Sequence, residues 1–149
     1  MENAGQRLLV VEDDVTVARA LSRTLARRGY AVAICRSCTA ARALAQTFDF
    51  AVLDLDLPDG NGVDLARDLM ADGKVPSVLF FTGSCDSAML ARARRVGTVV
   101  TKAEGSSSVL AFLASFAREH ADPPQSQTAA KVGSFRASSS SSLRRQRAR

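Results

Sequence analysis

The sequence predicts a doubly wound α/β fold, in which helices cover both faces of a central parallel β-sheet. Five apolar runs of four to six residues alternate with segments whose apolar residues recur at helical spacing. Glycine, proline or charged residues separate each run from the next segment. This alternation favours parallel strands, because each strand needs a crossover helix to return the chain to the same edge of the sheet.

The first part of the chain supplies two strands and two helices. Residues 8–11 are an apolar run that stops at an acidic loop, and residues 15–28 carry apolar side chains at helical spacing. Gly29 stands where a helix C-cap is expected. Residues 31–35 form a second apolar run. A second helix is expected over residues 39–46, with its first threonine as the N-cap.

The third apolar run, residues 50–53, is the predicted central strand. A loop rich in carboxylates, glycine and proline follows it and leads into a third helix, which should end near Gly73. Pro76 then precedes a fourth predicted strand over residues 77–82. The parallel sheet therefore has a central strand that ends directly in a functional loop.

The last predicted elements are a helix, a strand and a final helix. Either Ser84 or Asp86 can cap the fourth helix, and Gly97 should follow its end. Residues 98–101 form the fifth strand. The last helix is expected over residues 107–120, where apolar residues again recur at helical spacing.

Five polar residues fall at the carboxyl ends of four predicted strands. Glu12 and Asp13 follow the first strand, Asp54 the third, Thr82 ends the fourth and Lys102 follows the fifth. Right-handed crossovers bring these ends to one edge of the sheet, which is where ligands bind in open α/β folds. We therefore expect the functional site at this edge.

The residue types at this edge suit phosphoryl transfer. Three neighbouring carboxylates repel one another unless a cation lies between them, and oxygen ligands in an open site favour Mg²⁺. Lys102 could pair with Asp54 at rest and with a phosphoryl oxygen after transfer, to which the Thr82 hydroxyl could also bind. A carboxylate nucleophile beside Mg²⁺ and a lysine can form an acyl phosphate.

These residues in this order, with Pro58 and Gly62 after Asp54, resemble the CheY-like receiver domain of two-component response regulators over about residues 7–120. The resemblance implies a flavodoxin-like sheet of strand order 2-1-3-4-5 with five helices. It also implies a signalling protein, not an enzyme, whose only catalysis is its own phosphorylation and dephosphorylation. Its partners would be a histidine kinase or phosphotransfer protein and an output protein, with a homodimer left open.

The resemblance also assigns roles to the site residues. Asp54 would accept a phosphoryl group, and Mg²⁺ would be held by the carboxylates of Glu12, Asp13 and Asp54 and by the main-chain carbonyl of Asp56. Thr82 and Lys102 would then bind the phosphoryl group and shift the face formed by the fourth helix, fifth strand and fifth helix.

Two positions depart from the family pattern. The family usually has an aromatic residue three positions before the lysine, where this chain has Val99, and a proline after the lysine, where it has Ala103. We expect the phosphorylation chemistry to survive both changes. The usual output switch and the conformation of the loop after Lys102 are the features that these changes affect.

Two alternatives to a phosphorylated receiver remain at this point. One is a degenerate receiver that serves only as a protein-docking scaffold. The other is a phosphatase of the haloacid dehalogenase type, because Asp54-Leu55-Asp56 after an apolar strand resembles the first motif of those enzymes. Pro58 stands where they usually have threonine or valine, and they do not need an acidic pair after the first strand.

Composition divides the chain into a domain over residues 1–121 and a tail over residues 122–149. All acidic residues lie at or before Asp122, and removing the six basic residues from Lys131 onward leaves 14 Lys and Arg against 15 acids. The Ser- and Arg-rich tail is expected to be disordered and to hold no output domain; its arginines could bind nucleic acid only weakly.

Three cysteines without an export signal indicate reduced thiols in a cytoplasmic protein without membrane spans.

Overall fold

A computed structural model describes residues 5–119 of the chain. Residues 5–114 belong to one compact unit, which contains the sheet and the predicted site. The second unit, residues 115–149, is described only over residues 115–119, the end of the last helix. The predicted tail, residues 122–149, lies outside the described residues. No helix within residues 5–119 has both the length and the apolar character needed to cross a membrane.

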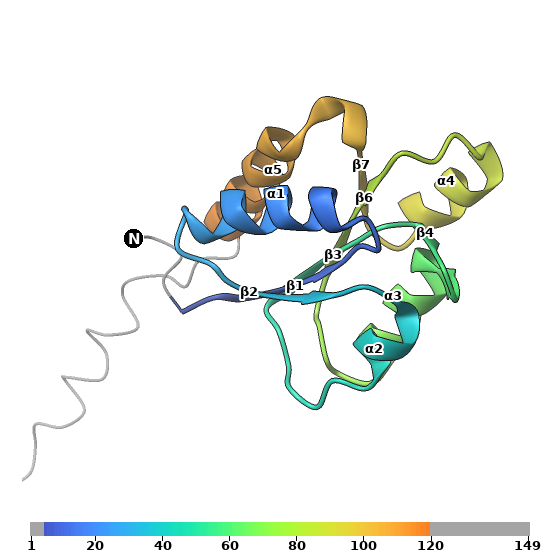
Figure 1. Cartoon of the computed structure of the whole chain (residues 1–149), viewed down its shortest axis with the longest axis horizontal. Coiled ribbons are helices and arrows are strands. Elements are labelled where there is room, and N and C mark those ends of the chain that lie inside the picture. Colours follow the sequence, from blue (N-terminus) through green and yellow to red (C-terminus); the bar gives the residue numbers. More distant parts are fainter. Residues whose placement is uncertain (1–4, 120–149) are drawn as a thin grey trace, which may run out of the picture. The chain divides into compact units, whose positions relative to one another are not determined.

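A five-stranded parallel sheet forms the centre of the first unit (Figure 1). Its strand order is β2-β1-β3-β6-β7, which confirms the predicted flavodoxin-like order 2-1-3-4-5. An additional antiparallel pair, β4 and β5, was not predicted. The strands are β1 (Arg7–Val11), β2 (Ala31–Cys35), β3 (Phe50–Leu53), β4 (Asp56–Leu57), β5 (Gly60–Asn61), β6 (Val78–Thr82) and β7 (Thr98–Thr101).

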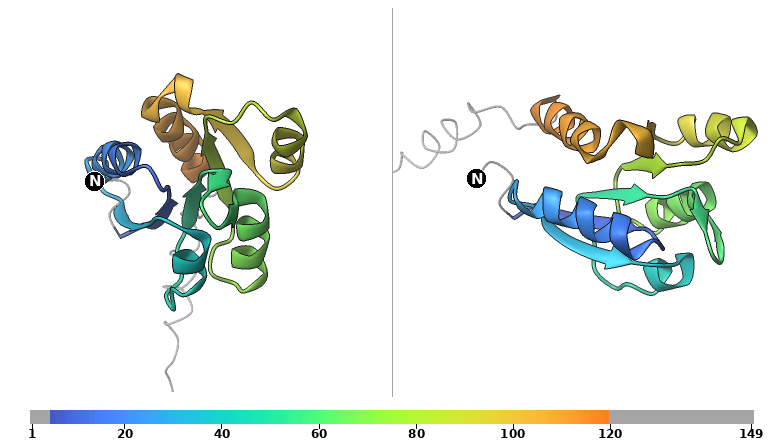
Figure 2. Two further views of the ribbon diagram at one scale, coloured as in Figure 1. Left: turned by 45° about the vertical axis from the view of Figure 1, so that its right-hand side comes forward. Right: turned by 45° about the horizontal axis from the view of Figure 1, so that its top comes forward.

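Within residues 5–119, four α-helices connect successive strands of the main sheet, and a fifth follows the last strand. Helix α1 and residues 106–114 of α5 cover one face, and α2 and α3 lie side by side on the other (Figures 1 and 2). A short 3-10 helix, η1, connects β7 to α5. The helices are α1 (Val15–Ala26), α2 (Cys38–Arg42), α3 (Gly62–Ala71), α4 (Ser87–Arg94), η1 (Lys102–Glu104) and α5 (Ser106–Glu119).

The core consists of apolar side chains on both faces of the sheet. All four residues of β3 are buried, as expected for a central parallel strand that is covered on both sides. Alternate residues of β1 and β3 join a cluster with side chains from α2, α3 and α4. The intervening residues Leu8, Val10 and Val52 are equally buried, on the face that carries α1. This packing holds β3 rigidly at the centre of the sheet.

The parallel hydrogen-bond pattern continues past the strand ends and so fixes the register of the site. The main-chain N–H of Asp54 donates to the Val11 carbonyl at 3.0 Å, and that of Glu12 donates to the Cys35 carbonyl at 3.0 Å. The main chains of the two acidic residues are therefore held by neighbouring strands, and their side chains start from adjacent points at one edge of the sheet.

The start and end of α2 differ from the sequence prediction. Ser37, and not Thr39, caps the helix: its hydroxyl accepts a hydrogen bond from the Ala40 N–H at 3.1 Å. The helix ends at Arg42 instead of extending to residue 46, and in the chain that follows the Phe48 N–H donates to the carbonyl of Lys74, in the loop before β6, at 2.8 Å. Thr39 is thereby free to bond to another part of the chain.

Candidate functional site

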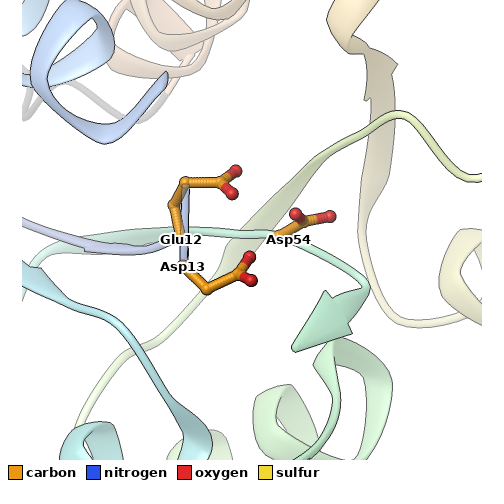
Figure 3. A group of neighbouring side chains, drawn as sticks. All are labelled: Glu12, Asp13 and Asp54. Atoms are coloured by element: carbon orange, nitrogen blue, oxygen red, sulfur yellow. The ribbon is translucent and has the colours of Figure 1, made fainter. Parts of the chain in front are cut away.

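Three carboxylates meet at the carboxyl edge of the sheet. Glu12 and Asp13 follow β1, and Asp54 follows β3 (Figure 3). One carboxylate oxygen from each of the three lies within 4.8 Å of the other two. Glu12 and Asp54 are only 3% and 5% exposed, whereas Asp13 is exposed to solvent. The predicted acidic cluster therefore forms, with two buried members and one that faces water.

Lys102, the first residue of η1, approaches this cluster from the end of β7. Its Nζ lies 2.8 Å from Asp54 Oδ2, which confirms the predicted pairing, and 2.7 Å from Glu12 Oε2, which the sequence did not predict. Asp14 N–H donates to the other Glu12 oxygen at 3.1 Å. The ammonium group thus bridges the two buried carboxylates.

Burial and charge act in opposite directions on these groups. Burial raises the pKa of Glu12, and the negative charge of Asp54 adds to this, against hydrogen bonds from Lys102 and Asp14. Burial by itself lowers the pKa of Lys102, but its hydrogen bonds to Asp54 and Glu12 outweigh burial and leave that pKa above its ordinary value. Lys102 is therefore a cation at neutral pH.

The cluster suits a divalent cation. Three carboxyl groups and one ammonium carry a formal net charge of −2, and all the ligand atoms on offer are oxygens. Hard oxygen ligands at a site partly open to water are what Mg²⁺ prefers. The exposed Asp13 provides the open side. The donor set, its charge and its exposure therefore fit this ion.

Two further residues that the sequence predicted for the site, Asp56 and Thr82, lie near Asp54 and Lys102 in the fold. Asp56 follows Asp54 by two positions, and its main-chain N–H is 3.4 Å from Asp54 Oδ1. Thr82, the last residue of β6, is fully buried, and its hydroxyl accepts a hydrogen bond from the Ser84 N–H at 3.1 Å. Its position in the sheet puts Thr82 beside Thr101, which immediately precedes Lys102.

Gly62 also determines the geometry of the site, whereas the sequence indicated only a loop residue that matches the family pattern. A methyl group at Gly62 would overlap the main-chain oxygen of Asp54 and lie 3.1 Å from Leu55 Cα. The Gly62 N–H donates to the Leu55 carbonyl at 2.9 Å. The start of α3 therefore lies directly against the main chain of Asp54, which only glycine permits. A glycine shortly after a strand-end carboxylate was the available signal.

The loop after Lys102 has a defined structure without proline. Glu104 accepts hydrogen bonds from the N–H and the hydroxyl of Thr101, at 2.8 and 3.0 Å, and so closes η1 as a capping box. All peptide bonds within residues 5–119 are trans, including the one before Ala103. Val99 is partly buried and packs against the core cluster. The capped η1 turn therefore fixes the main chain of Lys102, which is the first residue of η1.

Comparisons with known proteins agree with this geometry. Two curated relatives are the DNA-binding response regulator MtrA of Mycobacterium tuberculosis, 40% identical over 83 residues, and the acid tolerance regulatory protein ActR of Rhizobium meliloti, 31% identical over 127 residues. The MtrA alignment covers 53% of this chain and 36% of MtrA, and the ActR alignment covers 83% of this chain and 66% of ActR. The chain thus spans only part of the length of these relatives.

A solved structure and a family profile also match this chain to response regulators. The non-phosphorylated HemR receiver domain from Leptospira biflexa matches with a TM-score of 0.59 and 34% identity, over 65% of this chain and 82% of that one. The profile of the response regulator receiver domain matches residues 8–112. Members of this family typically bind Mg²⁺ at such an acidic group. The chain therefore belongs to the response regulator receiver domain family of two-component signalling.

Proposed function

We propose that Asp54 accepts a phosphoryl group from a partner histidine kinase or phosphotransfer protein, in a reaction that depends on Mg²⁺. One observation carries this proposal. The Asp54 carboxylate follows the central strand, lies within 4.8 Å of the Glu12 and Asp13 oxygens and is 2.8 Å from Lys102 Nζ. A nucleophilic carboxylate, a cation site and a lysine are thus present together, as an acyl-phosphate mechanism requires.

The reaction is an in-line displacement at phosphorus. An Asp54 oxygen attacks the phosphorus atom of the donor, the new O–P bond forms, and the donor's N–P bond breaks with its electron pair remaining on the histidine nitrogen, which takes up a proton. Hydrolysis reverses the modification: water attacks the same phosphorus atom, and Asp54 and inorganic phosphate are released. The protein contributes mainly position and charge in both steps.

Bound Mg²⁺ would neutralise negative charge on the phosphoryl oxygens. Glu12, Asp13 and Asp54 would hold it through carboxylate oxygens, together with the main-chain carbonyl of Asp56. Lys102 would exchange its contact with Asp54 for a phosphoryl oxygen, and the Thr82 hydroxyl would donate to another. Glu12 would keep Lys102 at the site during this exchange, since it contacts the ammonium independently of Asp54.

The output proposal follows the positions of these two groups in the fold. Thr82 ends β6, directly before the loop to α4, and Lys102 follows β7, directly before α5 in the chain. A change in the contacts of these two side chains would therefore shift the main chain next to both helices. We place the output surface on α4, β7 and α5, where a separate protein or a second copy would bind. We also propose a cytoplasmic location, which is typical of response regulators.

The direct test is the intact mass of the full chain after incubation with acetyl phosphate, with and without Mg²⁺, beside the Asp54→Asn variant. We expect one phosphoryl adduct that requires Mg²⁺ and is absent from the variant. If neither acetyl phosphate nor a histidine kinase gives an adduct, the phosphoacceptor role is wrong and a docking scaffold is the better explanation. Steady release of phosphate from added phosphomonoesters would instead indicate the phosphatase alternative.

A further inference from the structure

One carboxylate joins the loop after Asp54 to a different helix. Asp59 lies at the tip of the β4–β5 hairpin and accepts three hydrogen bonds from the start of α2. The donors are the Cys38 N–H at 2.8 Å, the Thr39 N–H at 2.9 Å and the Thr39 hydroxyl at 2.6 Å. The bonded residues are 20 or 21 positions apart in sequence, so the contact is tertiary. We call these three residues the α2 clasp.

The next two hairpin residues contact the same helix. A Cβ atom at Gly60 would lie 3.2 Å from Cys38 Sγ, so the hairpin is in close contact with that buried side chain. The Cys38 thiol also lies 4.0 Å from the Asn61 carbonyl oxygen, to which it can donate. Three successive residues of the hairpin are thus held against the first two residues of α2.

The hairpin connects the clasp to the proposed metal site. Asp56 pairs with Asn61 and Leu57 with Gly60, so that Pro58 and Asp59 form a two-residue turn. An isolated two-stranded hairpin is marginally stable in water even when it is longer than this one. The anchored tip therefore helps to fix the conformation of Asp56, which lies at the open end of the hairpin beside Asp54.

The bonds of the clasp are charge-assisted. The hydrogen bonds from the Thr39 hydroxyl and main chain, followed by that from Cys38, hold the pKa of Asp59 well below its usual range. The carboxylate is therefore ionised at neutral pH, and hydrogen bonds to an ionised acceptor are stronger than neutral ones. The clasp lies on the surface, but two of its three donors are main-chain N–H groups at the start of α2, which the helix already orders; the third is the Thr39 hydroxyl.

We propose that Asp59 and Thr39 are positioning residues for Mg²⁺, because their clasp fixes the hairpin that presents the main-chain carbonyl of Asp56. This inference rests on the proposed function. Neither side chain contacts the ion. Loss of an outer-shell partner of a metal ligand typically costs 10- to 100-fold in affinity. The clasp acts one step further out, through the main chain, so we expect a loss of about three- to tenfold.

The test is calorimetric titration of the full chain with MgCl₂, which does not depend on phosphorylation. Asp59→Asn removes the charge and replaces one of the two accepting oxygens with an NH₂ group, which cannot accept, so at least one of the three bonds is lost. Thr39→Val removes only the hydroxyl bond at nearly constant size. Asp68→Asn is the matched control: it removes the same charge and breaks the 2.8 Å ion pair between Asp68 and Arg42, which joins α3 to α2 without touching the hairpin.

We expect the Mg²⁺ dissociation constant to rise most in Asp59→Asn, less in Thr39→Val, and to stay unchanged in Asp68→Asn. Thr39→Ser should restore the wild-type value, because its hydroxyl can donate to the same carboxylate. Equal affinities in the wild type and Thr39→Val would overturn the proposal, and this variant keeps it testable if Asp59→Asn fails to fold. A wild type without Mg²⁺ affinity would instead overturn the proposed function, and the clasp's role with it.

Discussion

Substitution of Gly62 tests whether the close approach of α3 to Asp54 is essential. Helix propensity alone favours Gly62→Ala, because alanine is preferred over glycine in a helix by about 1 kcal/mol. The structure predicts the opposite sign. The new methyl group would overlap the Asp54 main-chain oxygen and lie 3.0 Å from its carbonyl carbon. Neither neighbour is the movable end of a side chain, so the main chain itself would have to shift.

The expected change in stability is the steric cost of the new methyl group minus the gain in helix propensity. Over-packing in a well-packed region typically costs about 1–3 kcal/mol. We expect Gly62→Ala to cost the upper end of this range or more, because the main chain of Asp54, which would have to move, is hydrogen-bonded to Val11 in β1. After subtraction of the propensity gain, we expect a net loss of about 2 kcal/mol in the free energy of unfolding. With a urea m value of about 1–2 kcal/mol per M for a domain of this size, the midpoint should fall by roughly 1–2 M.

The assay is urea denaturation of the full chain, followed by the acetyl-phosphate reaction at a temperature where the variant is folded. Gly83→Ala is the control, since the nearest atom to its new methyl group would be Lys102 Cδ at an ordinary 3.9 Å. We expect Gly83→Ala to retain wild-type stability within about 1 kcal/mol. Gly62→Ala should also react more slowly, because Asp54 is displaced. A Gly62→Ala variant as stable as the wild type would refute the reasoning.

Three further predictions concern stability. Lys102→Met should lower the free energy of unfolding by about 1–3 kcal/mol in Mg²⁺-free urea titrations, because Glu12 and Asp54 lose their shared cation; an unchanged midpoint would contradict this. The pKa of Asp59 is lowered by folding, so the stability it contributes is present above its unfolded pKa of about 3.8 and is lost as the pH falls through its folded value. The stability difference between the wild type and Asp59→Asn should therefore shrink on acidification below pH 4; a pH-independent difference would argue against it. Asn61→Ala removes the N-cap of α3 and should cost about 1 kcal/mol by thermal unfolding, whereas no loss would show that the cap is dispensable.

The sequence predicted the sheet and the placement of the site because both depend on long patterns. The apolar run before Asp54 matches β3 residue for residue, and the strand order follows from alternating strands and helices. Convergence of Glu12 and Asp54 needs only parallel strands and right-handed crossovers. These features do not depend on the details of individual side chains, so a pattern of residue types was sufficient.

Features set by tertiary contacts were missed. Ser37 and Thr39 are both good N-cap residues, and local sequence does not choose between them. In the folded chain the Thr39 hydroxyl donates to Asp59, 20 positions away, which leaves Ser37 as the N-cap. Strands β4 and β5 have two residues each, which is too short for an alternating pattern. The contact between Lys102 and Glu12 joins the ends of β7 and β1, which are not neighbours in the sheet, so no pairing rule predicts it.

The charge balance of the site links its stability to its function. Burial disfavours the ionised form of Glu12, and Lys102 contacts both Glu12 and Asp54 but supplies only one positive charge. A ligand that binds only the native state stabilises it by RT ln(1 + [L]/Kd), or about 1.4 kcal/mol at a concentration of ten times Kd. Added Mg²⁺ should therefore raise the stability of the wild type by this amount but leave Asp54→Asn much less affected. Such a difference would show that the cost of gathering carboxylates at this edge is offset by the ion, and not by Lys102 alone.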